Sequence, residues 1–176
     1  MNGTQIGWSP FPPAGPRTLF IYDIENVIGA GAHITAAQVG RAQARLNAAV
    51  PVRPGDHTVI ACNGANAAAV HLSWAGSADR RVRSGRDGAD AALLEAIDDA
   101  KWVAARYKRV VIATGDGGFA EAVASLKAAG CTVVVIAPDV GLSKRMRLAA
   151  GPHLVQLGSS VPVSSIHMHE STREVA

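Results

Sequence analysis

The stretch Val110–Phe119, VVIATGDGGF, decides the fold that the sequence predicts, together with the earlier stretch Leu19–Asn26, LFIYDIEN. Each is a short apolar run of strand length that ends in an aspartate, and polar or turn-forming residues follow directly. Continuous apolar runs are typical of strands that are buried on both faces of a parallel sheet. The carboxyl ends of parallel strands line one crevice, where ligands bind. We therefore expect Asp23 and Asp116 to face the same crevice.

Strand-like and helix-like segments alternate along the rest of the chain, which predicts an α/β fold. Apolar runs indicate the strands, and apolar residues at helical spacing indicate the helices between them. The expected strands are 17–22, 57–62, 80–83, 109–113, 132–137 and an edge strand at 154–157. The expected helices are 35–49, 65–74, 89–106, 117–129 and 143–150. This order predicts a three-layer α/β/α sandwich with a mainly parallel central sheet.

The composition indicates one compact domain. The 176 residues are 48% hydrophobic and 18% charged, which is enough to bury a core without metals or disulfides. We expect an extended or disordered arm at 1–16, which is rich in Pro and Gly, a domain at 17–157 and a flexible tail at 158–176. Cys62 and Cys131 lack metal-ligand spacing and lie in or near apolar runs, so we expect buried free thiols.

The charge and the absence of targeting signals limit the partners. A formal net charge of +3 is a mild bias that permits a polyanionic partner without requiring one. The basic residues form two local clusters: Arg80, Arg81, Arg83 and Arg86, and then Lys144, Arg145 and Arg147. The sequence has no secretory signal at its start and no apolar stretch of membrane-span length. We expect a cytoplasmic protein without a membrane partner.

Three aspartates are the candidate metal ligands. Asp23 and Asp116 end their strands, whereas Asp90 lies in the first turn of a predicted helix. Asp90 precedes Leu93 and Leu94 by three and four positions, so it lies on the core-facing side of the helix and points toward the crevice. Carboxylate oxygens suit Mg²⁺ or Mn²⁺, and Mg²⁺ binds a few carboxylates together with water and substrate phosphate. The predicted cofactor is therefore Mg²⁺ or Mn²⁺.

Each aspartate also has a structural interpretation. Asp23 could cap a turn, and Asp116 could cap the helix that follows it. Asp87 and Asp90 have the spacing of a capping box, in which Asp87 caps the helix and Asp90 reaches back. Capping and phosphate binding are compatible at the start of a helix.

Four further residues are candidates for binding substrate. Asn26 could hold a water molecule or a phosphate oxygen, and Thr114 could hydrogen-bond the site. Arg83 and Arg86 come shortly before Asp90, so they could hold the backbone of a nucleic acid that enters the site. A solvated loop is the competing interpretation of these arginines.

At these residues the sequence resembles the NYN domain family, which comprises PIN-like ribonucleases and includes the LabA group. The resemblance covers roughly residues 17–157 and rests on three stretches: FIYDIEN, GADAALLEAID and VVIATGDGGFAEAVASLKAAGCTVVVIA. It implies a PIN-like fold, RNA as partner, and metal-dependent RNA cleavage with Asp23, Asp90 and Asp116 as ligands. It also implies a possible homodimer. Gly118 stands where the family often has a second aspartate, so this site has one carboxylate fewer.

Three functions stay open at this point. The favoured one is a metal-dependent endoribonuclease. Because Gly118 replaces an acid, the domain could instead be a weak or inactive module that binds RNA or protein. The apolar run followed by D-x-E is also similar to haloacid-dehalogenase-like phosphatases, in which Asp23 would be the nucleophile. That family requires an aspartate at the position of Glu25 and a further acid after Gly-Asp, and both fit poorly.

Overall fold

A single parallel sheet organises the part of the chain that the structure describes, which is residues 16–29, 33–138 and 140–158 of a computed structural model. Its strands are β1 Thr18–Asp23, β2 His57–Cys62, β3 Asp79–Val82, β4 Arg109–Ala113, β5 Thr132–Ala137 and β6 Leu154–Gln156. Their order is β3-β2-β1-β4-β5-β6, and every described pair is parallel. The expected arm at 1–16 and the expected tail at 158–176 lie outside the described residues, apart from residues 16 and 158.

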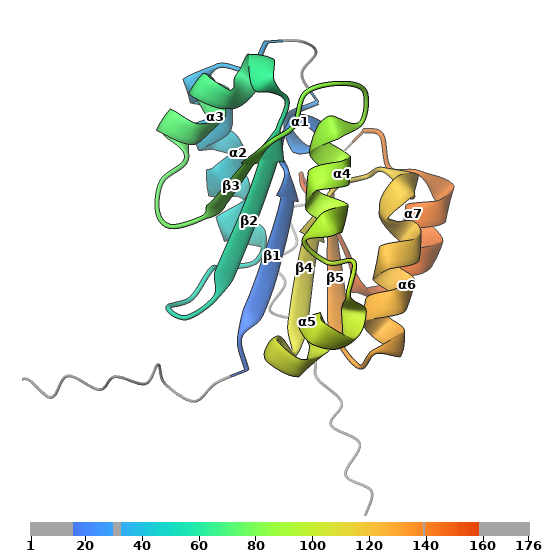
Figure 1. Ribbon diagram of the computed structural model, residues 1–176. Helices are drawn as coiled ribbons and strands as arrows, with labels where there is room; N and C mark the ends of the chain where they lie inside the picture. Colours follow the sequence, from blue (N-terminus) through green and yellow to red (C-terminus); the bar gives the residue numbers. More distant parts are fainter. Residues whose placement is uncertain (1–15, 30–32, 139, 159–176) are drawn as a thin grey trace, which may run out of the picture.

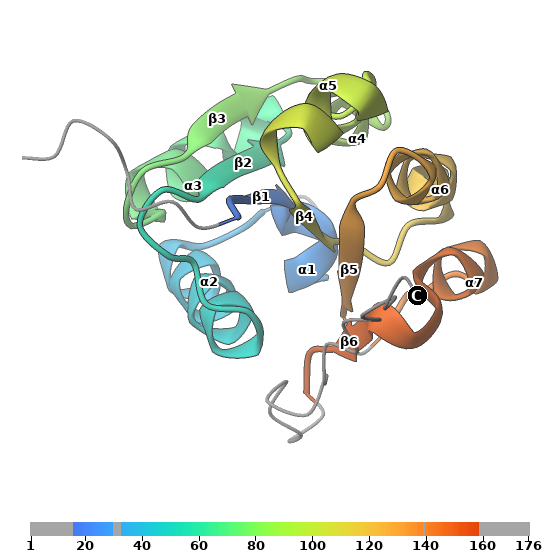
Figure 2. The ribbon, with the colours of Figure 1, turned by 90° about the horizontal axis from the view of Figure 1, so that it is seen from below.

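Helices cover both faces of the sheet, so the predicted α/β/α sandwich is confirmed (Figures 1 and 2). One face carries α1 Ile24–Ile28, α2 Ala36–Ala49 and α3 Ala67–Ser73. The other face carries α4 Gly88–Glu95, α5 Ala100–Arg106, α6 Ala120–Ala128 and α7 Lys144–Ala150. Short 3₁₀ turns at Gly64–Asn66, Gly117–Phe119 and Gly151–His153 precede α3, α6 and β6. None of the helices in the described ranges is long and apolar enough to cross a bilayer.

The central strand β1 supplies side chains to a hydrophobic core on each face of the sheet. Phe20 and Tyr22 pack on the side of α1, α2 and α3, and Leu19 and Ile21 pack on the opposite side. All six residues of β1 are buried. Alternate side chains of a strand point to opposite faces, so a strand covered on both faces must be apolar throughout. This explains the uninterrupted apolar run that identifies the strand in the sequence.

The direction in which successive strands are added to the sheet reverses between β1 and β4. β2 and β3 lie on one side of β1, and β5 and β6 lie on the far side of β4. Such a reversal opens a crevice at the carboxyl ends of the two central strands, and ligands of open α/β sheets bind there. Asp23 is the last residue of β1, and Asp116 follows β4 by three residues. The fold therefore brings the two acidic strand ends to the same edge.

The prediction of one helix over 89–106 is wrong, because two helices occupy this segment. α4 ends at Glu95 and α5 begins at Ala100. The side chain of Asp99 accepts a hydrogen bond from the backbone N–H of Trp102 at 2.9 Å and so caps the second helix. Buried apolar residues continue through the break, with Ile97 between the helices. The apolar spacing alone therefore did not reveal the interruption.

The residues after Asp23 form a short helix, α1, where a loop was expected. Asp23 accepts a hydrogen bond from the backbone N–H of Asn26 at 3.0 Å and caps this helix. Gly29 ends it with a φ of 65°, a left-handed conformation that glycine adopts without a steric penalty. Glu25 and Asn26 are consequently held on a fixed helical turn at the mouth of β1.

Replacing the cap of α5 should destabilise the protein. We expect Asp99→Ala to lower the free energy of unfolding by about 1 kcal/mol, because the N–H of Trp102 loses its acceptor. Asp99→Asn is the matched control, since asparagine caps helices about as well as aspartate. Urea unfolding of the three proteins measures the difference. Equal losses in both variants would contradict a capping role.

Candidate functional site

Asp23 and Asp90 lie close together at the reversal point of the sheet, where each carboxyl group shifts the pKa of the other. Asp23 is 4% exposed at the end of β1. Asp90 lies half-buried in the first turn of α4. The core-facing position expected for Asp90 therefore brings it to the carboxyl group at the end of the central strand.

The hydroxyl of Thr114 connects Asp23 to the segment that carries Asp116. Thr114 is fully buried just after β4 and donates a hydrogen bond to Oδ2 of Asp23 at 3.1 Å. The same hydroxyl accepts a hydrogen bond from the backbone N–H of Asp116 at 3.2 Å. Because Oδ1 of Asp23 already accepts from the N–H of Asn26, both oxygens of this buried acid have a donor. The orientation of Asp23 is thus fixed from both neighbouring segments.

Burial raises the pKa of Asp23 from the usual 3.8 to about 7. The hydrogen bond from Asn26 opposes this rise, whereas the negative charge of Asp90 adds to it. The pKa of Asp90 is raised as well, first by burial and then by the charges of Asp116, Asp87 and Glu25, while its hydrogen bond with Asp23 lowers it. The titrations of the two carboxyl groups are therefore coupled, and the negative charge of one makes ionisation of the other less favourable.

An open cleft of about 280 Å³ surrounds this pair. The ends of β1 and β2, helix α1 and the loop before α4 contribute its lining residues: Asp23, Glu25, Asn26, Asn63, Gly85, Asp87, Gly88, Ala89 and Asp90. Four of these nine residues are acids, and none is basic. A cleft lined by one sign of charge concentrates ions of the opposite sign, so this cleft favours cations.

Asp116 lies beside the pair, outside the lining of the cleft. Its side chain is exposed and accepts a hydrogen bond from the N–H of Gly118 at 2.8 Å, so the predicted capping role is confirmed. Its charge nevertheless acts on Asp90 and raises the pKa of that group. The structure thus brings Asp23 and Asp90 together and leaves Asp116 at the margin.

The donor set fits a hard divalent cation in part. Within residues 16–29, 33–138 and 140–158, no three His, Cys, Asp or Glu side chains are close enough together to hold a metal ion. Mg²⁺, however, commonly binds one or two carboxylates and completes its shell with water and substrate phosphate. A pair of carboxyl groups that repel one another when both are ionised suits such an ion.

Asn26 links the two strand ends through its side chain. Its Oδ1 accepts a hydrogen bond from the backbone N–H of Gly115 at 2.8 Å, and the backbone N–H of Asn26 donates a hydrogen bond to Oδ1 of Asp23. Asn26 also lines the cleft. Its oxygen therefore holds the Asp116 segment against α1, and the water- or phosphate-binding role expected from the sequence stays a prediction.

The two arginines expected to bind phosphate lie outside the cleft lining. Arg83 forms an ion pair with Glu95, with 2.5 Å between Nη2 and Oε2. The Arg86 side chain is 95% exposed, and its Nε lies 3.7 Å from a carboxylate oxygen of Asp87. The capping role expected for Asp87 is wrong, because its side chain makes no capping hydrogen bond and its φ is 56°. The loop before α4 therefore turns without the predicted capping box.

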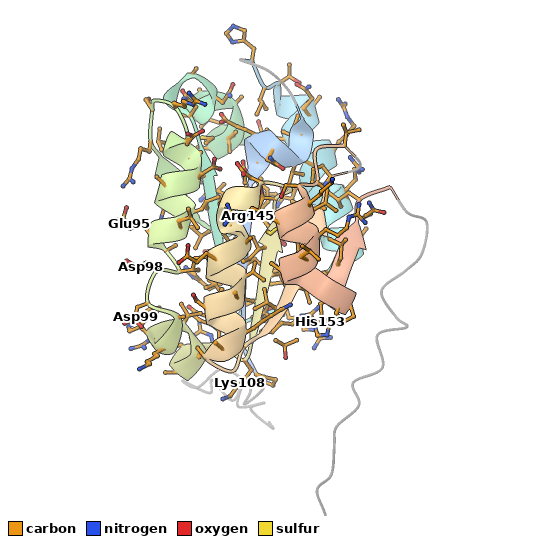
Figure 3. All side chains as sticks on the ribbon, turned by 90° about the vertical axis from the view of Figure 1, so that its right-hand side faces the viewer. Glu95, Asp98, Asp99, Lys108, Arg145 and His153 are labelled. Atoms are coloured by element: carbon orange, nitrogen blue, oxygen red, sulfur yellow. The ribbon has the colours of Figure 1, made fainter. Side chains whose placement is uncertain are left out.

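Glu25 and Asn63 line the cleft but were not predicted as site residues. Glu25 lines the cleft, and its Oε1 accepts hydrogen bonds from the Asn63 N–H at 2.9 Å and the Asn66 side chain at 2.6 Å. The available signal was that Asn63 follows β2, which ends at the same edge as β1. Asp98, by contrast, lies beyond the carboxyl end of α4 with the neighbouring Asp99, away from this edge (Figure 3). Its side chain is exposed and does not line the cleft.

Comparisons with known proteins agree with this architecture. The family model described as NYN domain matches residues 34–157. The match includes Asp90 and Asp116 but begins after β1, so it does not include Asp23. A crystallised protein of unknown function from Vibrio parahaemolyticus has a similar fold, with a TM-score of 0.52 and 16% identity over 85% of this chain and 97% of that one. No curated protein matches the chain.

The raised pKa of Asp23 predicts a pH dependence of stability. The folded protein binds this proton more tightly than the unfolded chain, so ionisation costs stability as the pH rises from about 4 to about 7. Asp23→Asn stays neutral and should lose less stability over this range, and near pH 8 it should be more stable than wild type by roughly 1–4 kcal/mol.

Urea unfolding with EDTA, near pH 5 and near pH 8, measures this effect. Asp98→Asn is the control and should follow the wild-type protein at both values, because Asp98 is exposed and distant from the pair. An identical pH dependence in Asp23→Asn and wild type would contradict the buried, proton-binding state of Asp23.

Proposed function

Because the chain belongs to the NYN domain family, we propose that it is a metal-dependent ribonuclease that hydrolyses phosphodiester bonds of RNA. The observation that supports this most is the Asp23–Asp90 carboxyl pair in an acid-lined cleft at the reversal point of the sheet. The same crevice is the usual ligand site of open α/β sheets. The geometry of this edge and the family membership together support the proposal.

The charge of the cleft favours a cation as part of the reaction. A phosphodiester is an anion, and the four acids of the cleft would repel it unless positive charge were added. Asp23 and Asp90 would hold a Mg²⁺ or Mn²⁺ ion, and Asp116 would contribute from the neighbouring strand end. The ion would supply charge that offsets the charge building on the phosphate, and it would make a water molecule more acidic.

The neighbouring residues orient the acids. Thr114 and the N–H of Asn26 each donate to one oxygen of Asp23, so this carboxyl group is held in one orientation. The Asn26 side chain holds Gly115, and with it the Asp116 segment, against α1. We infer that Asn26 and Thr114 are positioning residues of the site.

A catalytically weak module that binds RNA or protein is the second candidate. It is favoured by the exposed position of Asp116, by the glycine at position 118 and by the lack of three gathered acids in the described residues. The phosphatase interpretation has less support. Glu25 stands where that family needs an aspartate, and it is engaged by Asn63 and Asn66.

An RNA cleavage assay with Mn²⁺, Mg²⁺ or EDTA tests the ribonuclease proposal. We expect cleavage that requires the divalent ion and falls at least about tenfold in Asp23→Asn, Asp90→Asn and Asp116→Asn, because each change removes a candidate ligand. Asp98→Asn removes an exposed acid away from the site and should cleave like the wild type. Cleavage that persists in EDTA, or that Asp116→Asn leaves unchanged, would sink the proposal. An inactive wild type that still binds RNA would favour the second candidate.

Adding an acid at position 118 tests the cost of the missing carboxylate. A Cβ atom at Gly118 would lie 3.6 Å from Oδ1 of Asp116, an ordinary contact distance, so Gly118→Asp should fold without strain. We expect this variant to bind Mn²⁺ more tightly than wild type, by about tenfold for one added ligand. Gly118→Asn is the control of equal size without the charge. Isothermal titration of Mn²⁺ measures both, and equal affinities would contradict a ligand role for position 118.

A further inference from the structure

The start of α7 is fixed against the segment that carries Asp116. The backbone N–H of Ser143 donates to the carbonyl of Gly115 at 2.9 Å. Side chains at the two glycines that flank Asp116 would collide with this region. A Cβ at Gly115 would lie 2.8 Å from the carbonyl oxygen of Gly141, and one at Gly117 would lie 2.9 Å from Oγ of Ser143. The two glycines therefore allow the first turn of α7 to lie directly beside Asp116.

This first turn carries two positive charges. Ser143 caps α7, and the fully buried Met146 anchors it, which leaves Lys144 and Arg145 exposed. A Cβ at Gly117 would lie only 3.6 Å from Cβ of Arg145, so this arginine starts next to the Asp116 segment. Figure 3 shows Arg145 near the upper ends of α6 and α7, far from Lys108 at the bottom of the view.

Lys144 and Arg145 are also chemically available. Among the described residues, neither side chain has a hydrogen bond or an ion pair. Three of the four arginines in the cluster before α4 differ, whereas Arg86 is exposed and lies 3.7 Å from a carboxylate oxygen of Asp87. Arg80 donates to three backbone carbonyls, Arg81 binds Asp79 and the carbonyl of Ala92, and Arg83 is paired with Glu95. Arginines that already satisfy protein acceptors have fewer donors left for phosphate.

We propose that Lys144 and Arg145 bind the phosphate backbone of an RNA strand on the Asp116 side of the carboxyl pair. This inference rests on the proposed function. It assigns the contact with the RNA phosphate backbone to the start of α7 instead of to Arg83 and Arg86. The acid-lined cleft holds no basic residue of its own, so a polyanion needs positive side chains at its border. A strand that passes Asp116 meets such side chains at α7. The contact carries no base information, because Lys and Arg bind the phosphates of any sequence.

The test measures RNA binding without cleavage. Fluorescence anisotropy with a labelled single-stranded RNA of about 12 nucleotides is recorded in EDTA over a range of salt concentrations. The variant Lys144→Gln/Arg145→Gln is compared with wild type and with Lys101→Gln/Lys108→Gln. The control pair is exposed, removes the same charge and lies on or beside α5. Circular dichroism establishes that each variant is folded.

We expect the α7 variant to bind RNA about tenfold more weakly and to lose about 1.4 from the slope of log K against log salt, or about 0.7 for each phosphate contact on a single strand. The control pair should stay close to wild type, because charges beyond about 10 Å are screened at moderate salt. Equal weakening in both variants, no weakening in either, or a wild type that does not bind RNA would overturn the proposal. Competition by poly-glutamate as strong as that by RNA would also overturn it, in favour of an acidic protein partner.

The outcome is separable from that of the ribonuclease proposal. If binding depends on Lys144 and Arg145 but no metal supports cleavage, the RNA surface is supported and the ribonuclease proposal fails. If cleavage is metal-dependent but the α7 variant binds RNA like wild type, the ribonuclease proposal is supported and the α7 surface is overturned.

Discussion

The burial of one carboxyl group at the end of β1 is the constraint on which this site depends. Taking Asp23 out of water is unfavourable, and the protein offsets part of the cost with donors from Asn26 and Thr114. Those donors sit on α1 and just after β4, so the same hydrogen bonds that satisfy the acid also join the two segments around the crevice. The remaining cost appears as the raised pKa that Asp23 and Asp90 share. The burial of Asp23 therefore accounts both for the hydrogen bonds that join these segments and for the raised pKa values.

Charge is distributed unevenly around this centre. Acids of β1, α1 and the start of α4 line the cleft, whereas exposed cations follow on α7, beyond Asp116. Under the two proposals, a divalent ion would bind at the acids and an RNA phosphate chain would bind at the cations. Family membership alone gives no such detail, because the matched segment starts after β1 and omits Asp23.

The sequence predicted the sheet better than the side-chain contacts. The bounds of β2, β4 and β5 agree with the expected 57–62, 109–113 and 132–137, because buried parallel strands must be apolar throughout. The expected single helix failed at Asp99, since a local cap interrupts the chain without disturbing the apolar spacing. The approach of Asp90 to Asp23 followed from helix geometry. The pairing of Arg83 with Glu95 could not be predicted, because a long side chain reaches several acceptors and only the folded arrangement selects one.

The contact between α7 and the Asp116 segment also bears on the order in which the site is built during synthesis. β1 precedes the other described strands in the chain, whereas its neighbour β4 begins only at Arg109 and α7 only at Lys144. Until β4 emerges, one edge of β1 has no partner, and Asp23 lacks the hydroxyl of Thr114. Contacts between such distant segments form late, because closing long loops is slow. A nascent chain therefore has only the nearby N–H of Asn26 to orient Asp23 until Thr114 has been made, and the Asp116 segment gains its contact with α7 later still.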